Sequence, residues 1–155
     1  MTAVTTPPAT TGERLLVASR LFGPLSVARD EVITMPDGML GFAGERRWIM
    51  LPAAPDGVFW LQNIDDSGLV FLLVDPFQFF PGYVVDVPEV PEPAPGASVA
   101  VLTIVTLPRE KGGEATANLQ APVVIEYPAR QARQVVLPDP AYHTRHPIDL
   151  RKKLA

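Results

Sequence analysis

The stretch "VFWLQNIDDSGLVFLLVDPF", residues 58–77, decides the fold. Residues 58–64 alternate between two faces, which predicts a β-strand. Residues 65–68 are the turn-forming sequence Asp-Asp-Ser-Gly, and a second apolar run, residues 69–74, follows at once. The two runs therefore predict a β-hairpin. The second run is apolar on both faces, which indicates a central strand that is buried on both sides.

The end of this stretch predicts a short helical turn. Asp75-Pro76 ends the second strand, since Pro76 suits the first position of a 3₁₀ or α turn, and Pro81 stops it. Phe77 and Phe80 are three residues apart and would share one face of such a turn. We expect these two rings to close one end of the core and Phe79 to remain available to a partner.

The rest of the chain also has strand-like patterns. Turn signals recur about every ten residues, which indicates an all-β sandwich or barrel with minimal helix. Proline makes up 18 of the 155 residues and disfavours helices. The remaining predicted strands are residues 14–19, 31–34, 46–51, 98–107, 114–119, 121–127 and 134–137. At the C-terminus, residues 148–154 allow one or two helical turns.

The length of 155 residues suits one domain. We interpret residues 1–12 as a flexible N-terminal tail, 13–150 as the domain and 151–155 as a basic C-terminal tail. The first segment lacks the basic and apolar regions of a signal peptide. The longest strictly apolar run, residues 69–74, is far shorter than the roughly 20 residues that span a membrane. We therefore expect a cytoplasmic protein that binds no membrane.

Charge is divided into two blocks along the sequence. Residues 48–108 contain no Lys or Arg and seven carboxylates, a local charge of −7. Residues 128–155 carry six basic and two acidic side chains, a local charge of +4. The acidic block favours a basic partner and disfavours direct nucleic-acid binding, because phosphates would be repelled. The alternative interpretation is an ordinary solvated acidic face with the basic tail folded beside it.

No set of residues predicts an enzyme. The chain has no cysteine, and its serines lie in no nucleophile motif. His143 and His146 form a His-x-x-His pair, but nothing selects the third ligand that a metal site would need. Asp65 and Asp66 are adjacent in a turn, where carboxylates seldom converge as an acid–base pair. We expect no catalytic residue, no metal and no cofactor, and interpret the chain as an interaction module.

Five segments together resemble the flagellar assembly factor FliW family. Residues 38–51 read "GMLGFAGERRWIML", residues 99–108 "VAVLTIVTLP" and residues 115–125 "ATANLQAPVVI". The other two are "FWLQNIDDSGLVFLLVDPFQFFPGY", residues 59–83, and "QVVLPDPAYHTRHPI", residues 134–148. Their order and spacing match the family over residues 13–150. The resemblance implies a small antiparallel β-barrel-like domain.

The same resemblance implies a regulatory role and two protein partners. Members of the family bind flagellin and also CsrA, a small basic RNA-binding regulator. Binding sequesters CsrA and relieves its repression of flagellin mRNA translation. The alternatives are a chaperone that binds flagellin only, or a small β-barrel ligand-binding protein or enzyme of unknown substrate.

Charge and exposure suggest which residues would contact the two partners. Complementary charge favours carboxylates for CsrA, and the candidates are Asp65, Asp66, Asp86, Glu89 and Glu92. Amphipathic helices of flagellin would need an apolar groove. For this contact we predict the aromatic side chains of Phe79 and Tyr83.

Overall fold

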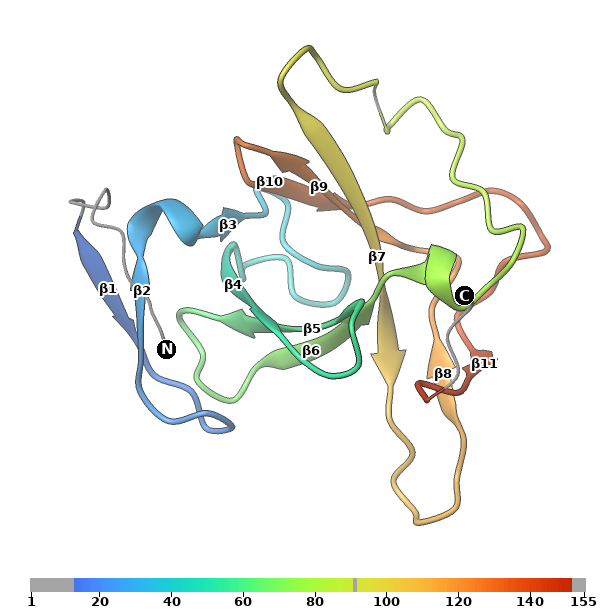
Figure 1. The fold of residues 1–155 in the computed structure, drawn as a ribbon, viewed down its shortest axis with the longest axis horizontal. Coiled ribbons are helices and arrows are strands. Elements are labelled where there is room, and N and C mark those ends of the chain that lie inside the picture. The colour runs from blue at the N-terminus through green and yellow to red at the C-terminus, as the bar shows by residue number, and fades with distance from the viewer. Residues whose placement is uncertain (1–12, 91, 152–155) are drawn as a thin grey trace.

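The computed structural model describes residues 13–90 and 92–151, and Figure 1 shows an almost entirely β architecture. The only helices among these residues are two 3₁₀ turns, η1 (Arg29–Glu31) and η2 (Pro76–Gln78). None of the described helices is long and apolar enough to cross a membrane. The strands are β1 (Arg14–Val17), β2 (Leu25–Ala28), β3 (Ile33–Thr34), β4 (Arg47–Pro52), β5 (Val58–Asn63), β6 (Val70–Val74), β7 (Ser98–Thr106), β8 (Ala115–Ala117), β9 (Val123–Tyr127), β10 (Gln131–Gln134) and β11 (His146–Ile148). The expected all-β fold with minimal helix is confirmed.

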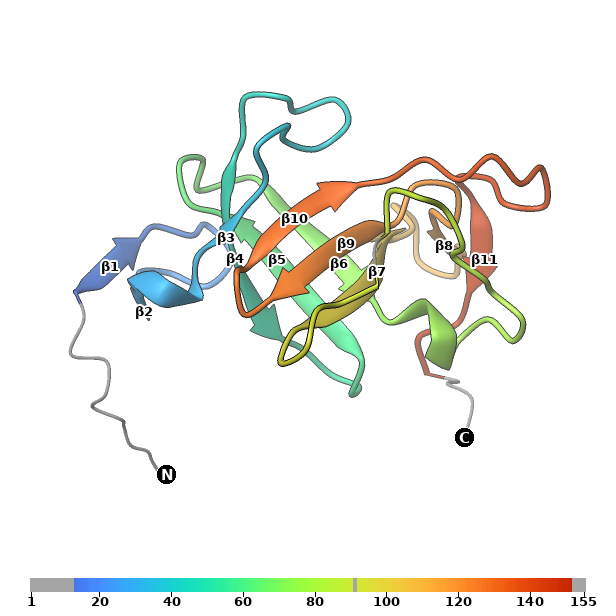
Figure 2. The ribbon, with the colours of Figure 1, turned by 90° about the horizontal axis from the view of Figure 1, so that it is seen from above.

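Seven strands close into a barrel. Their order is β7-β6-β5-β4-β3-β10-β9, and β9 pairs with β7 to complete the ring. The neighbours are antiparallel except β10 and β3, which meet in parallel with Gln131 opposite Thr34. β8 and β11 continue the sheet outward from β7, and β1 and β2 form a separate hairpin. In Figures 1 and 2 these additions lie at opposite ends of the barrel.

The hairpin predicted from residues 58–74 is the β5–β6 pair. Val58 lies opposite Val74, and Gln62 lies opposite Val70. Successive β6 side chains enter different apolar clusters: Leu73 packs inside the barrel, whereas Leu72 and Val74 pack on its outer face. β6 is therefore buried on both faces, as its sequence predicts.

Alternation along the strands sorts the apolar side chains into three layers. The barrel interior is filled by a cluster that includes Ile33, Trp48, Leu61 and Ile125. One outer layer lies under β8, β11 and the loops that follow β6 and β10. The other lies under the β1–β2 hairpin, where Val17 and Val27 pack on Ile49 of β4. The barrel thus carries two covering layers, which leave only parts of its outer wall for partners.

Two predicted segments near the C-terminus differ from the structure. The strand predicted at residues 134–137 begins and ends earlier, as β10, although the amides of Val135 and Leu137 still bond to the carbonyls of Pro122 and Gln120. A helical turn predicted from residue 148 is wrong at its start, because Ile148 belongs to β11 and pairs with Ala115. The predicted tails, residues 1–12 and 152–155, lie outside the described residues.

Candidate partner-binding surface

The turn that carries Asp65 and Asp66 is fixed by a buried asparagine. The Oδ1 atom of Asn63, which is fully buried, accepts hydrogen bonds from the amides of Asp65 at 2.8 Å and Asp66 at 2.7 Å. The Oδ1 atom of Asp66 then accepts from the amide of Gly68 at 3.0 Å. Asx side chains favour such turns because they replace missing backbone partners. The predicted tight turn between β5 and β6 is confirmed.

Asp65 does not present an unpaired charge. Its Oδ1 atom lies 2.7 Å from Nη2 of Arg47, and its Oδ2 atom accepts from Nε of the same guanidinium at 3.4 Å. The hydrogen bond and charge of Asp65 raise the pKa of Arg47 above its ordinary value. Both side chains are about half exposed, so the pair contributes little to stability but neutralises one carboxylate of this turn.

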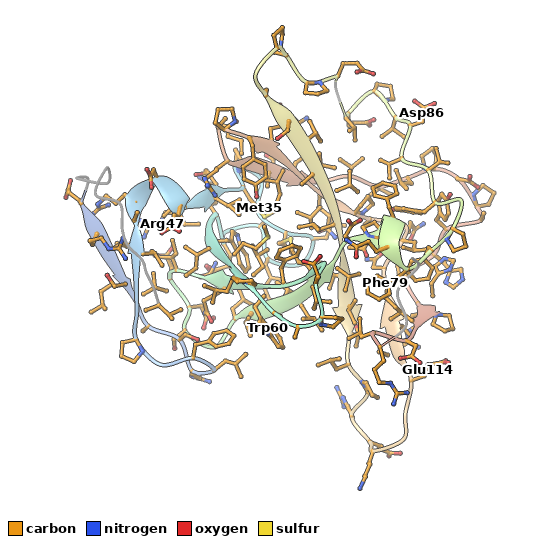
Figure 3. The ribbon with its side chains drawn as sticks, in the orientation of Figure 1. Met35, Arg47, Trp60, Phe79, Asp86 and Glu114 are labelled. Carbon is orange, nitrogen blue, oxygen red and sulfur yellow. The ribbon has the colours of Figure 1, made fainter. Side chains whose placement is uncertain are left out.

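The other three acidic candidates lie elsewhere on the molecule. Asp86, Glu89 and Glu92 are exposed on the long connection before β7, residues 84–97, which we call the acidic loop. Figure 3 places Asp86 on this loop, far from Arg47 on β4. No ion pair involves these three carboxylates within the described part of the chain. The five acidic candidates therefore form two separate sites, of which the acidic loop keeps its full charge.

A small groove runs beside Asp86. Its volume is about 130 Å³, and its lining combines two carboxylates with apolar side chains: Val84, Asp86, Val87, Leu137, Pro138, Asp139 and Tyr142. Tyr142 ties the two walls together, because its hydroxyl accepts from the amide of Val84 at 3.0 Å. Sequence reasoning missed Asp139 and Tyr142, since they lie more than fifty residues from Asp86 and in the basic block.

The aromatic residues after β6 are placed differently from the prediction. Phe77 was expected in the core but is 48% exposed. Phe79, which was expected to face a partner, is partly buried and packs with Phe80 against the outer cluster. The face-sharing argument fails because η2 ends at Gln78, so Phe80 is no longer on a helix. Phe77 is thus the exposed aromatic of this segment, and Phe79 contributes mainly to packing.

Tyr83, proposed from sequence as an exposed contact, is a core residue. It is only 6% exposed, and its hydroxyl donates to the carbonyl of Leu119 at 2.8 Å. Its ring meets Tyr142 edge to face at 4.8 Å between centroids. Burial, together with the neighbouring Tyr142, raises the pKa of the Tyr83 phenol, which keeps it a neutral donor. The sequence prediction missed this because Leu119 and Tyr142, which bury Tyr83, are distant from it in the sequence.

Other exposed apolar side chains gather around loops that the strand pattern did not single out. In the loop before β4, Leu40 and Phe42 are exposed, and Phe42 contacts Phe71 edge to face. Beside the β1–β2 hairpin, Leu21 and Phe22 are exposed, and the Phe22 ring lies 6.0 Å from Trp60, the tryptophan labelled in Figure 3. In the sequence these side chains are isolated apolar residues among turn-forming residues, so no pattern identified them as a surface.

The rings of His143 and His146 stack on each other. Their ring centroids are 3.8 Å apart, and Nε2 of His146 accepts from the amide of His143 at 3.0 Å. Nδ1 of His143 accepts from the amide of Arg145 at 3.3 Å. Within residues 13–90 and 92–151, no three His, Asp or Glu side chains are grouped as metal ligands. The pair instead shapes the loop that leads into β11.

Lowering the pH through the range of His146 is expected to weaken the fold. Burial, and secondly the neighbouring His143, lower the pKa of His146 below its ordinary value of 6.5. The unfolded chain then binds a proton more readily, so stability falls as pH drops below about 6.5. Thermal melts between about pH 7.5 and 5.5 should show a steeper loss than in His146→Gln, whose side-chain oxygen can still accept the amide bond. Identical slopes would rule out a contribution from His146.

The fold and this surface define a class of protein: a small closed β-barrel with two covering layers and an acidic loop. The family model "FliW protein" matches residues 16–148. A flagellar assembly factor FliW of Natranaerobius thermophilus is 33% identical over 138 residues, covering 85% of this chain and 91% of that protein. The FliW of Bacillus subtilis is 33% identical over 139 residues, covering 86% and 96%. A crystal structure of the flagellar assembly factor FliW superposes with a TM-score of 0.76 at 27% identity, covering 89% of this chain and 99% of that one. The chain belongs to the FliW family.

Proposed function

We propose that this protein is a flagellar assembly factor that binds flagellin and, alternatively, sequesters the translational regulator CsrA. Sequestration would relieve repression of flagellin mRNA translation, and free flagellin would compete for the protein. In this proposed role the protein acts in the cytoplasm, as a binding module rather than an enzyme. Its relatives carry the name of an assembly factor, which supports the assembly role.

The acidic loop is the observation that best supports binding of a basic regulator. Asp86, Glu89 and Glu92 are exposed, and the sequence around them has no Lys or Arg between residues 48 and 108. Complementary charge of this kind speeds association with a basic protein and disfavours nucleic acid. The nearby groove, with Val84 and Tyr142 in its wall, adds apolar surface to the same region.

For flagellin, the exposed apolar side chains are the better candidates. Phe77 lies between β6 and the acidic loop and is 48% exposed, and Val84, the first residue of that loop, is 58% exposed. An amphipathic helix binds by placing apolar side chains at a helical spacing into such a surface. Contacts on one region by both partners would also account for competition between them.

Calorimetric titration of the purified protein against flagellin and CsrA from the same organism tests the proposal. We expect each to bind, each to displace the other, and CsrA affinity to fall as salt rises from about 50 to about 500 mM, because exposed charges are screened. A flagellin titration should be much less sensitive to salt. Absence of binding to both would overturn the proposal, and binding of flagellin alone would reduce it to a flagellin chaperone.

A further inference from the structure

Strand β7 changes neighbours along its length and leaves one edge open. On one edge, residues Ser98–Leu102 pair with β9, and Val105 and Thr106 pair with β8. On the other edge, β6 covers only Thr103, Ile104 and Val105. Among the described residues, no strand lies opposite Ser98–Leu102 on this second edge. The barrel wall is therefore closed on one side of this half-strand and open on the other.

The direction of the backbone groups on β7 follows from one hydrogen bond. The carbonyl of Ile104 accepts from the amide of Asn118, so the backbone groups of Ile104 point toward the β8–β9 side. Successive residues of a strand point their N–H and C=O groups to opposite edges. The N–H and C=O groups of Thr103 thus point toward β6, where Thr103 lies opposite Val74. The N–H and C=O groups of Val101 and Val99 point to the same edge, beyond the end of β6.

The end of β6 explains why this edge is not covered. The amide of Asp75 donates to the carbonyl of Gly57 at 2.8 Å, which extends the β5–β6 pairing by one residue on the side away from β7, so Pro76 is the next residue whose backbone would face β7. Pro76 has no amide hydrogen and begins η2, which leads the chain away. Asp75 caps this turn by accepting from the amide of Phe77 at 3.0 Å. The Asp75-Pro76 pair that ends the deciding hairpin therefore also creates the opening.

A groove of about 330 Å³ lies along the open edge. Its lining comprises the β7 residues Val99, Ala100, Val101 and Leu102 and, on the facing side, Asp56, Gly57, Phe59, Asp75, Phe77 and Gln78. The lining includes two carboxylates and no basic side chain. The exposed ring of Phe77 offers apolar contact at its rim.

The open edge of β7 lacks the usual protection against strand addition. Edge strands are commonly blocked by lysine, proline or a bulge. Ser98–Leu102 contains no charged residue and no proline, and its pairing with β9 runs without interruption. An unprotected edge beside an acidic groove is a surface on which another chain can add a strand.

We propose that the open edge of β7 binds an extended, basic peptide segment of a partner protein by β-strand addition. The peptide backbone pairs with Val99 and Val101, a Lys or Arg side chain faces Asp56 and Asp75, and an apolar side chain contacts Phe77. This mode does not depend on which proteins are the partners, so it goes beyond the proposed function.

Amide hydrogen exchange followed by NMR tests whether the edge is open. In the free protein, the amides of Val99 and Val101 should exchange much faster than those of Ala100 and Leu102, which pair with β9. Equal protection of all four amides at low protein concentration would overturn the proposal. Fast exchange that becomes protected only as the protein concentration rises would assign the edge to a second copy of this chain, which also overturns it.

Three capped heptapeptides test the occupant. One alternates valine and threonine around a central lysine, the second replaces the lysine with glutamate, and the third carries N-methyl groups on the lysine peptide's pairing face. We expect the lysine peptide to shift the Val99 and Val101 resonances and to protect their amides. The other two peptides should bind at least about tenfold more weakly, the loss expected from one charge-assisted or backbone interaction. Equal binding of all three peptides would contradict strand addition.

Val101→Pro supplies the matching change in the protein. It removes the outward amide and places a proline ring on the edge, a position where folded sheets tolerate proline. Val136→Pro is the matched control. The amides of the two neighbouring residues, Val135 and Leu137, donate to the carbonyls of Pro122 and Gln120, whereas Val136 itself is exposed. Loss of peptide binding in the first variant and its retention in the second, with unchanged melting curves, is the expected result. If Val101→Pro still binds the lysine peptide, or if only Val136→Pro loses binding, the assignment of the edge is wrong. If either variant unfolds, amide exchange in the wild-type protein decides whether the edge of β7 is open.

Discussion

Replacing Tyr83 with alanine is expected to lower the free energy of unfolding by about 3–5 kcal/mol, the range for removing a buried aromatic side chain. The Tyr83 ring is nearly inaccessible to solvent and packs edge to face on Tyr142. The substitution also leaves the carbonyl of Leu119 without its hydroxyl donor. Urea denaturation monitored by circular dichroism measures the change. An unaltered midpoint would show that Tyr83 is not part of the core.

Two control variants separate the parts of this effect. Tyr83→Phe keeps the ring and removes only the hydrogen bond, which should cost about 1–3 kcal/mol because a buried carbonyl loses its partner. Phe77→Ala removes a similar ring that is half exposed and should cost less than about 1 kcal/mol. If Phe77→Ala destabilised the protein as much as Tyr83→Ala, the placement of these two rings would be contradicted.

The prediction of the β5–β6 hairpin succeeded because its signals are local. Three signals lie within twenty residues and all predict the same hairpin: the alternation in residues 58–64, the turn sequence and the apolar run that follows. Asp75 and Pro76 add a cap and a stop whose effect depends only on the next few residues. Each local preference agrees with the final fold, which is the condition under which sequence reasoning works.

Barrel closure could not be predicted in this way. β9 pairs with β7 over Ser98–Leu102, and the parallel contact of β10 with β3 joins Gln131 to Thr34 across nearly a hundred residues. No local pattern states which strands become neighbours. The short strands β2 and β11 were missed for the same reason: Leu25–Ala28 and His146–Ile148 are strands only because β1 and β8 lie beside them.

The candidate site was predicted in composition but not in arrangement. Counting charges along the chain identified an acidic block, yet Arg47 lies just outside it and pairs with Asp65 across the β4–β5 hairpin. Conversely, Asp139 falls in the basic block but lines the groove with Asp86. A charge balance per segment cannot show which side chains become neighbours after folding.

Neutralising the acidic loop is expected to weaken binding of CsrA more than neutralising the β5–β6 turn. The triple variant Asp86→Asn, Glu89→Gln and Glu92→Gln removes three exposed carboxylates that have no ion-pair partner among the described residues. At about 0.5–1 kcal/mol for each charge near an interface rim, affinity at low salt should fall roughly 10- to 100-fold. The loss should appear mainly in the association rate, because long-range attraction guides the encounter.

The double variant Asp65→Asn and Asp66→Asn is the matched control for charge removal. Asp65 is already neutralised by Arg47, and an asparagine at position 66 keeps the oxygen that accepts from Gly68. This variant should therefore fold normally and weaken binding only a few-fold. Surface plasmon resonance at low and high salt compares the two. A larger loss in the double variant would move the binding surface to the turn, whereas equal, salt-independent affinity in both variants would show that charge does not guide this partner at all.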